Sequence, residues 1–406
     1  MDYTQIANRL QKISSEVDIR KEKINILKEN NIIPYVSKYD RTCTIKEANE
    51  MPEGERVRIA GRIIFRRIMG KFGFMKIQDV ESAIQVSVGR NELSEEDYDF
   101  YKKMIDIADF VGVEGVLYRT QTGELTVRAE KVELLSKAMR PLPEKFHGLV
   151  DQEAKYRQRY LDLISSEEAR KVMVGRSKAM KFIRNFLNDH GFMEVETPIL
   201  QSAVCGASAK PFFTKHNALN KMCNLRIAPE TYLKQVISAG FDRVFEMGKV
   251  FRNEGMDTQH LQEFTMCEWY ASYWDFEKNI TFFQEFMRSL LMNVIGTTKV
   301  MYQGIELDFG AEWQRVNYTE KMREILGFDF VTIDNVKELI AKVVETGLFK
   351  EEDFDGIKTC GGVIDYIYKR EIRTGLVQPT ILYNYPACLV PLARRNDKDN
   401  RLIDMF

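Results

Sequence analysis

Five short runs between about residues 55 and 135 alternate apolar and polar residues: RVRIAGRIIF, FGFMKIQD, AIQVSVGR, FVGVEGVLYRT and ELTVRAEKVELL. Alternation with a period of two is typical of half-buried β-strands. Turns containing glycine separate the runs, and one stretch with helical spacing, from about Leu93 to Ile107, interrupts them. Five strands of this length with a single inserted helix predict a small β-barrel.

The barrel is only one part of the chain, because 406 residues correspond to about two or three domains at roughly 150 residues each. The 59 lysines and arginines nearly balance the 60 aspartates and glutamates, for a net charge of −1. This balance excludes a uniformly basic nucleic-acid binder, so contacts with RNA would have to come from local patches. A hydrophobic content of 44% with only 10 prolines indicates an ordered globular protein.

Signals for export and for metal or disulfide chemistry are missing from the sequence. No apolar run approaches the ~18 residues of a membrane span, and the N-terminus MDYTQIANRLQK lacks the basic and then apolar pattern of a secretory signal. We therefore expect a cytoplasmic protein. The cysteines form no CxxC pair, so the sequence predicts neither a disulfide framework nor a zinc site. They are Cys43, Cys205, Cys223, Cys267, Cys360 and Cys388.

Outside the barrel, helical periodicity predicts one long amphipathic helix from about Thr4 to Asn30 and another from about Glu167 to Asp189, which Gly191 caps. The run FMEVETPIL alternates and predicts a strand that ends at Pro198. The segment 319–374 is expected to be mostly helical.

A charged, proline-containing link places the end of the barrel near residue 145. We therefore expect an N-terminal helical extension (1–50), the barrel (51–145) and a larger domain (146–406). The fold class is α+β with a mainly antiparallel sheet, because both hairpin-like turns and helices join the strands.

The most informative segment is RVFEMGKVFRNEG, followed by a polar loop and then EFTMCEWY, which together predict two strands joined by a turn. Since side chains alternate between the two faces of a strand, one face gathers an arginine, three carboxylates and two aromatic rings. On the first strand this face holds Val244, Glu246, Gly248, Val250, Arg252 and Glu254, and on the second it holds Phe264, Met266, Glu268 and Tyr270.

This face can be interpreted in two ways. Arg252 could grip a phosphate, Phe264 could stack on a base, and Glu254 could accept a hydrogen bond from an exocyclic amine, which together make a nucleotide platform without a glycine-rich loop. The face could instead be an exposed sheet surface with cross-strand ion pairs. Alternation alone favours neither interpretation.

Several motifs, however, resemble a known family. FRNEG followed by HLQEFTMCEWY is similar to motif 2 of the class II aminoacyl-tRNA synthetases, and GFMEVETPIL is similar to their motif 1. The chain further resembles the bacterial lysyl-tRNA synthetases, from the barrel to about Asp397. The runs that carry this resemblance are RRIMGKFGFMKIQD, TQTGEL, RPLPEKFHGLVDQEAKYRQRYLDLI, CGASAKPFFTKHNAL and RIAPETYLKQ.

The resemblance implies a fold and a reaction. The barrel would be an OB-fold anticodon-binding domain, and the larger domain a class II catalytic domain on a six-stranded antiparallel sheet. Lysine and ATP would form lysyl-adenylate and pyrophosphate, and the lysyl group would then move to the 3′ end of lysine tRNA.

The resemblance also implies residues that bind ATP. Arg252 would be catalytic, because it would hold the α-phosphate and stabilise the pentavalent centre electrostatically. Glu254 would bind the adenine amino group, and Phe264 would stack on the ring. His260 would lie beside the outer phosphates.

Lysine would be bound by carboxylates spaced along a cleft, which suits a substrate with two cations. Glu268 and Tyr270 would meet the side-chain ammonium, while Glu230 and the backbone at Gly206 would meet the α-amino group. Glu268 would repel aspartate, and a pocket carboxylate left without its ammonium partner would penalise neutral amino acids.

On the barrel, Phe72 and Phe74 share a face with Lys76 and Gln78, so that aromatic rings lie on a polar face. OB folds stack single-stranded bases on such rings. A partly covered core phenylalanine is an equally good interpretation of the residues alone.

Arg58, Arg62 and Arg66 share one parity of the first barrel strand. By resemblance, Arg66, Phe74 and Gln85 would read the central uridine of the lysine anticodon.

The chain also departs from the family. The acidic residues that ligate Mg²⁺, an asparagine and a glutamate of the lysine site, and motif 3 would all follow Phe406, so we expect no metal ligand within the chain, although the family uses ATP and Mg²⁺. The chain looks C-terminally incomplete, and we expect it to be inactive or unstable by itself. Other departures are Gln259, which weakens the expected grip on the γ-phosphate, and Leu261, Gln262, Cys205, Cys388 and Val390.

The expected partners are lysine tRNA, L-lysine and a second copy of the chain in a homodimer formed through motif 1, with no membrane. Two other functions stay open. An aspartyl or asparaginyl enzyme is disfavoured by Glu230 and Glu268. A non-catalytic RNA-binding protein would use the barrel alone.

Overall fold

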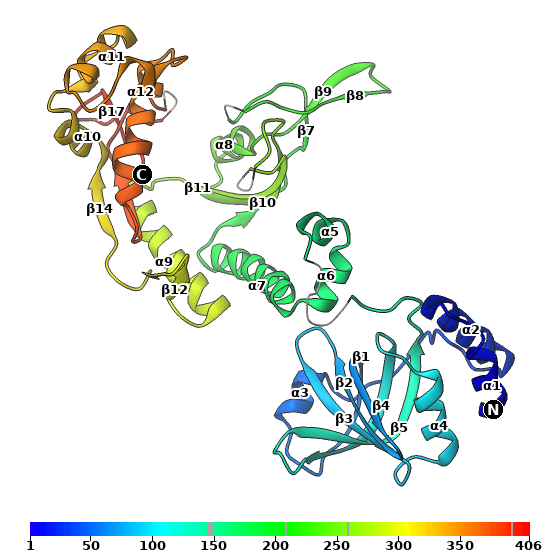
Figure 1. Cartoon of the computed structure of the whole chain (residues 1–406). Helices are drawn as coiled ribbons and strands as arrows, with labels where there is room; N and C mark the ends of the chain where they lie inside the picture. Colours follow the sequence, from blue (N-terminus) through cyan, green and yellow to red (C-terminus); the bar gives the residue numbers. More distant parts are fainter. Residues whose placement is uncertain (144–149, 208, 258–259, 391–392) are drawn as a thin grey trace. The chain divides into compact units, whose positions relative to one another are not determined.

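The computed structural model describes residues 1–143, 150–207, 209–257, 260–390 and 393–406. The chain divides into two compact units, Met1–Met173 and Val174–Phe406 (Figure 1). The boundary that we expected near residue 145 lies outside the described residues. The first unit extends beyond that position through two short helices to the beginning of a long one: α5 (Gln152–Arg157), α6 (Arg159–Ser165) and α7 (Glu167–Asp189).

The first unit contains the predicted closed barrel, with strand order β1-β2-β3-β5-β4. Alternate side chains such as Ile59, Met75, Ile77 and Val86 fill its interior, as expected for strands with one buried face. The predicted helix follows β3 in the chain. The elements are β1 (Arg56–Met69), β2 (Phe72–Gln78), β3 (Ala83–Gly89), α4 (Glu95–Met104), β4 (Phe110–Arg119) and β5 (Leu125–Ser136).

Two helices stand where the sequence predicted one long helix. The chain leaves α1 (Tyr3–Leu10) and begins α2 (Glu16–Glu29) after Ser15, whose hydroxyl accepts a hydrogen bond from the Asp18 N–H at 3.4 Å. Serine is favoured as an N-cap because its side chain satisfies an otherwise unpaired amide. The prediction of one helix from Thr4 to Asn30 is therefore wrong. A third short helix, α3 (Ile45–Glu50), precedes the barrel.

The central sheet of the second unit has the order β11-β10-β6. β10 (Arg243–Phe251) pairs with β11 (Glu263–Ala271) in antiparallel fashion and with β6 (Met193–Glu194) in parallel fashion. One face packs on α7 and on α9 (Phe276–Ile295), through side chains such as Phe245 and Trp269. Among the described residues this sheet has three strands, whereas the resemblance implied six.

The strand predicted from Phe192 to Pro198 is much shorter than expected, because at Thr197 a side chain takes the place of the backbone partner. The Val195 N–H still donates to the Phe245 carbonyl at 2.9 Å. The Thr197 N–H and hydroxyl instead donate to the Glu246 carboxylate, at 3.2 and 2.6 Å. Strand pairing therefore ends before Pro198, and it resumes only in β7 (Leu200–Gln201).

A second small sheet has the order β7-β9-β8. Its strands β8 and β9 form a hairpin that extends from the unit (Figure 1). The next helix, α8, contacts both β10 and β11. The remaining strands form three pairs, of which only β14 with β15 is parallel. The elements are β8 (Phe213–His216), β9 (Lys221–Leu225), α8 (Glu230–Ser238), β12 (Lys299–Tyr302), β13 (Ile305–Asp308), β14 (Gln314–Asn317), β15 (Thr380–Tyr383), β16 (Tyr385–Pro386) and β17 (Leu402–Ile403).

The segment 319–374 is mostly helical, as predicted, and has its own apolar core around Met322, Leu339, Val343 and Ile367. Its elements are α10 (Tyr318–Leu326), η1 (Phe330–Thr332), α11 (Val336–Glu345), η2 (Glu351–Phe354), α12 (Cys360–Ile367), η3 (Tyr368–Ile372) and η4 (Arg373–Gly375). The α+β class is confirmed. All six cysteines lie in the described part of the chain and are free thiols. None of the helices described is long and apolar enough to span a bilayer.

Candidate functional site

The β10–β11 hairpin brings the two predicted residue sets onto one face. The backbone register pairs Val244 with Tyr270, Glu246 with Glu268, and Val250 with Phe264. Directly paired residues of antiparallel strands project to the same side. The other side of the hairpin is buried against α7 and α9, so this face is the one open to ligands.

Arg252 lies beside Phe264 at the loop end of the hairpin. Its guanidinium carbon is 5.2 Å from the centre of the Phe264 ring, and its Nε donates to the Ile227 carbonyl at 3.4 Å. The Arg252 N–H donates to the Gln262 carbonyl at 2.9 Å, which holds the chain at the start of the loop. A cation stacked on an aromatic plane can hold a phosphate next to a flat base.

Glu254 and His260 lie on the loop that follows. The Glu254 carboxylate accepts a hydrogen bond from the Lys210 N–H at 3.4 Å. His260 is paired with Asp257, with 2.7 Å between Nδ1 and Oδ2, and it is exposed. The departure at Gln259 lies outside the described residues, whereas Leu261 is an exposed side chain of the same loop.

The four residues expected to bind lysine form one cluster. Gly206 has a φ of +90°, and a Cβ built on it would lie 3.3 Å from the Ala228 Cβ and 3.5 Å from the Glu230 Cβ. The Tyr270 hydroxyl donates to Glu268 Oε2 at 3.3 Å. α8 begins at Glu230 and contacts both strands of the hairpin, so it brings the Gly206–Glu230 pair to the face that carries Glu268.

The Glu268 carboxyl is partly buried and lies near two other carboxylates, with Lys234 also close. Burial raises the pKa of the Glu268 carboxyl; the hydrogen bond from Tyr270 lowers it, and the carboxylates of Glu230 and Glu246 raise it further. Burial and the nearby Glu268 carboxylate hold the pKa of Tyr270 far above its ordinary value, so Tyr270 acts as a hydrogen-bond donor. Several facing carboxylates in a half-buried site favour a cationic ligand.

Sequence reasoning missed two basic residues at this cluster. Lys234, one turn along α8, pairs with Glu230 at 2.6 Å and lies 6.0 Å from the centre of the Tyr270 ring. The i,i+4 spacing of the two residues in ETYLK could have revealed this pair. Arg226 is buried and bonded to Glu246, and nothing in strand parity identifies it, because it lies outside the hairpin.

On the barrel, a β-bulge between Ile63 and Phe65 changes the parity of β1. The expectation that Arg58, Arg62 and Arg66 share one face is therefore wrong for Arg66. A bulge inserts one extra residue, so that all later side chains change sides, and alternation in the sequence does not reveal it.

As a result, Arg66 points toward α4. Its guanidinium donates to the carbonyls of Tyr101, Ile105 and Lys102, the last at 2.9 Å, and it lies 4.6 Å from the Tyr101 ring centre. A cation at the C-terminus of a helix stabilises it. Arg67 is exposed and is paired with Phe74 across the sheet, so it occupies the position that we predicted for Arg66.

The outer face of the barrel continues across β3 and β5. Phe74 is paired with Ser87, and Ser87 with Arg128. In the next row, Lys76 is paired with Gln85, whose amide donates to the Thr126 hydroxyl at 3.0 Å. Phe74 and Gln85 thus share one face with the cations of Arg67, Lys76 and Arg128, which fits a surface for single-stranded RNA.

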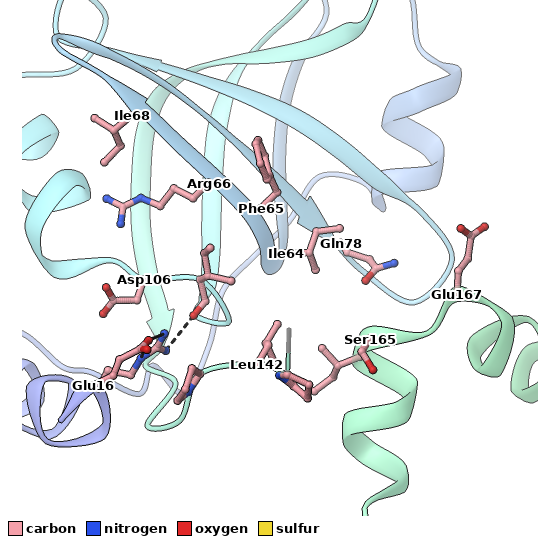
Figure 2. A pocket seen from close by; sticks show the side chains of 15 residues that line it. Glu16, Ile64, Phe65, Arg66, Ile68, Gln78, Asp106, Leu142, Ser165 and Glu167 are labelled. Atoms are coloured by element: carbon pink, nitrogen blue, oxygen red, sulfur yellow. Dashed lines mark hydrogen bonds and ion pairs between the residues drawn. The ribbon is translucent and has the colours of Figure 1, made fainter. Parts of the chain in front are cut away.

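A cavity of about 810 Å³ lies within the first unit (Figure 2). Ile64, Phe65 and Gln78 line it from the barrel, and Leu142 and Ser165 line it from the segment that follows. Both apolar and charged side chains line it, so the lining favours no single ligand chemistry.

Two of the cysteine departures also have defined surroundings. The Cys205 thiol donates to the Gln201 side-chain carbonyl at 3.8 Å, directly before Gly206. Cys388 lines a cavity of about 690 Å³ together with Cys360 and Arg395. Burial raises the pKa of both cavity thiols, so neither is activated as a nucleophile.

Comparison with known proteins agrees with this geometry. The model of the family described as tRNA synthetases class II (D, K and N) matches residues 151–405, and the model of the OB-fold nucleic acid binding domain matches residues 57–135.

Curated relatives cover nearly the whole chain. A lysine–tRNA ligase of Staphylococcus haemolyticus is 38% identical over 408 residues, which cover 98% of this chain and 82% of that protein. A lysine–tRNA ligase of Staphylococcus aureus is 39% identical over 408 residues, covering 98% and 81%, and one of Staphylococcus epidermidis is 37% identical over 410 residues, again covering 98% and 81%. The chain therefore belongs to the class II tRNA synthetases of the D, K and N group and, within it, to the lysine–tRNA ligase family.

Proposed function

We propose that the chain is a lysine–tRNA ligase that activates lysine with ATP and transfers it to the 3′ end of lysine tRNA. The observation that carries this proposal is that Glu268 and Tyr270, with Glu230 of α8 close by, lie on the same hairpin face as Arg252 and Phe264. A site for a cationic side chain thus adjoins a site for a stacked base and a phosphate.

In the first step, a carboxylate oxygen of lysine attacks the α-phosphorus of ATP. The bond from this phosphorus to the bridging oxygen breaks, and pyrophosphate leaves. Arg252 would stabilise the charge that develops on the α-phosphate oxygens, which is catalysis by a preorganised cation. Phe264 would stack on the adenine, Glu254 would accept from its amino group, and His260 would lie near the outer phosphates.

Recognition of lysine would rest on its two cations. Glu268 and the Tyr270 hydroxyl would hold the side-chain ammonium, and Glu230 with the backbone of Gly206 would hold the α-amino group. A neutral or anionic side chain would leave the half-buried Glu268 carboxylate unpaired or repelled, which disfavours binding.

In the second step, a hydroxyl of the terminal ribose of tRNA attacks the lysyl carbonyl, and AMP leaves. The barrel would select the tRNA through its anticodon, with a base stacked on Phe74 and read by Gln85. Arg67 would supply the neighbouring cation in the place first expected for Arg66, because Arg66 is bonded to α4.

Mg²⁺ enters this proposal only as the counter-ion of ATP. Among the residues that the structure describes, no group of three or more histidine, cysteine or acidic side chains is arranged to hold a metal ion. These residues therefore do not fit a resident metal, and no step is assigned to one.

A homodimer is supported by apolar side chains exposed around the motif 1 segment. Within that segment Met193 and Ile199 are each 42% exposed, and Leu200 is 53% exposed. Apolar side chains that stay exposed on a folded surface can form an interface. Light scattering is expected to give twice the chain mass, and a monomer would contradict this part of the proposal.

A cytoplasmic location is proposed because tRNA charging needs the cellular pool of ATP and tRNA.

The test is ATP–pyrophosphate exchange with the purified chain and a panel of amino acids. Exchange with lysine but not with aspartate or asparagine would support the proposal, and it would overturn the expectation, drawn from the sequence, that the chain is inactive by itself. Exchange that depends on aspartate or asparagine would instead indicate one of the related enzymes. Binding of lysine tRNA without any exchange would indicate an RNA-binding protein that does not catalyse the reaction.

A further inference from the structure

A buried arginine is bonded to Glu246, the residue paired with Glu268 of the proposed lysine site. Arg226 is only 2% exposed. Its Nη1 donates to the Glu246 carboxylate and, at 3.0 Å, to the Thr197 hydroxyl, while its Nε donates to the Lys249 carbonyl at 2.8 Å. Gly248 leaves the room for this guanidinium, because a Cβ at that position would collide with Nη2.

Glu246 is also buried, at 4% exposure, and its second carboxylate oxygen accepts from the Thr197 N–H and hydroxyl. Both charges are therefore hydrogen-bonded on several sides. Removing two charges from water is costly, and replacing such a pair by apolar residues is often neutral or stabilising. Stability alone is thus a weak reason for this pair.

The position of the pair relates it to both substrates. Glu246 is paired with Glu268 across the hairpin and projects to the same face. The Arg226 carbonyl accepts from the Phe251 N–H at 2.9 Å, immediately before Arg252, and the next residue, Ile227, accepts from the Arg252 side chain. Arg226 also begins the segment that leads to Glu230.

The charges around Glu268 indicate how Arg226 and Glu246 can affect the ionisation of its carboxyl. Glu268 faces Tyr270 on its own strand, Glu246 on β10, and Glu230 and Lys234 on α8. Without a balancing cation, the Glu246 carboxylate would favour protonation of Glu268, because two neighbouring carboxylates resist ionising together. Arg226, bonded to Glu246, supplies that cation.

We propose that Arg226 and Glu246 are positioning residues that balance each other's charge and thereby keep Glu268 ionised and ready for the lysine ammonium at neutral pH. This inference rests on the proposed lysine site. The role of the pair in substrate recognition is indirect, because neither residue is placed in contact with the substrate.

The two single variants are expected to act in opposite directions. Arg226→Gln leaves the Glu246 charge uncompensated. The acidic limb of lysine binding, which is the pH range in which binding is lost on acidification, therefore moves to higher pH by about one unit. This is the size of effect expected from one charge on the neighbouring strand. Glu246→Gln leaves an uncompensated cation, so the limb moves to lower pH, and lysine binds about tenfold more weakly at neutral pH because the cation repels the ammonium. The double variant Arg226→Gln/Glu246→Gln is expected to return the limb close to that of the unaltered protein.

The experiment measures lysine binding by calorimetry between pH 5 and 8, together with the pKa of Glu268 by ¹³C NMR, assigned with Glu268→Gln. The NMR arm does not depend on ligand binding. Lys249→Gln/Glu263→Gln is the matched control, because it removes the exposed 2.9 Å ion pair of the same hairpin and is expected to move neither value.

Opposite shifts that cancel in the double variant would support the inference. Shifts in the same direction, or weaker binding without any shift, would overturn it and leave the pair a structural role. If Arg226→Gln does not fold, Glu246→Gln and the double variant still decide the question. A protein that binds no lysine, but in which the Glu268 pKa shifts as expected, would contradict the proposed function and not the coupling.

Discussion

At the scale of single residues, Glu268 shows how the environment of a side chain determines its role. It lies half-buried on a sheet face, accepts one hydrogen bond from Tyr270, and is surrounded mainly by carboxylates. The folded protein therefore holds its charged form at a cost in free energy. Binding of a cationic ligand recovers that free energy, which is a physical basis for selecting lysine.

We predict that Glu268→Gln lowers lysine-dependent exchange about 100-fold or more, because the ammonium loses a buried charged partner, a change typically equivalent to about 2–5 kcal/mol. Kinetics of exchange measure the effect. Glu263→Gln, on the same strand but exposed, is the control and should retain activity. Unchanged kinetics in Glu268→Gln would refute the assignment.

The same residue predicts a pH effect on stability. Since the pKa of Glu268 is raised in the folded state, its charge destabilises the fold at neutral pH, and this cost disappears as the pH falls below the ordinary value of the carboxyl. Glu268→Gln is therefore expected to melt at the same or a higher temperature than the unaltered protein at pH 7, with the difference vanishing near pH 4. A lower melting temperature at pH 7 would contradict this sign.

At the scale of elements, the bulge in β1 decides which arginine is available to RNA. The extra residue directs Arg66 to the carbonyls that end α4, and it leaves Arg67 beside Phe74. A single irregularity in the strand thus separates two neighbouring arginines, because Arg66 contacts a helix of the barrel while Arg67 is exposed to solvent.

We predict that Arg66→Met destabilises the protein by about 2 kcal/mol, because charge-assisted hydrogen bonds to α4 are lost. Arg67→Met should leave stability unchanged and should weaken tRNA charging. Urea unfolding and aminoacylation kinetics measure the two effects. The opposite outcome, in which Arg66→Met impairs charging without destabilising the protein, would restore Arg66 to the anticodon face.

At the scale of the whole molecule, the two proposed activities reside in separate compact units. The barrel belongs to Met1–Met173, and the β10–β11 face belongs to Val174–Phe406. A defect on the barrel face should therefore reduce the use of tRNA without affecting the activation of lysine.

We predict that Phe74→Ala weakens tRNA binding by about 1–3 kcal/mol, the usual value of one base stacked on an aromatic ring, while lysine-dependent exchange stays intact. Aminoacylation and exchange measured on one preparation give the comparison. Phe110→Ala serves as a control, because Phe110 is an exposed barrel phenylalanine that lies under Arg62. Equal loss of both activities in Phe74→Ala would count against a separate RNA site.

Elements with local signals could be predicted from the amino-acid pattern alone. Alternation predicted all five barrel strands and both strands of the hairpin, and strand parity placed Glu246, Glu268 and Tyr270 on one face, as the register has them. Helical spacing predicted a helix from about Glu167 to Asp189, where the structure has α7. These predictions held because an element that is buried on one side needs apolar residues at a regular spacing along the sequence.

Features that depend on contacts between distant segments could be found only in the folded chain. The early end of β6, the bulge beside Phe65 and the burial of Arg226 against Glu246 leave no periodic trace. Each depends on interactions between residues that lie far apart in the sequence. Such interactions do not alter the periodic pattern of apolar and polar residues. The sequence therefore indicates which residues face a ligand, while the fold determines which charges surround them.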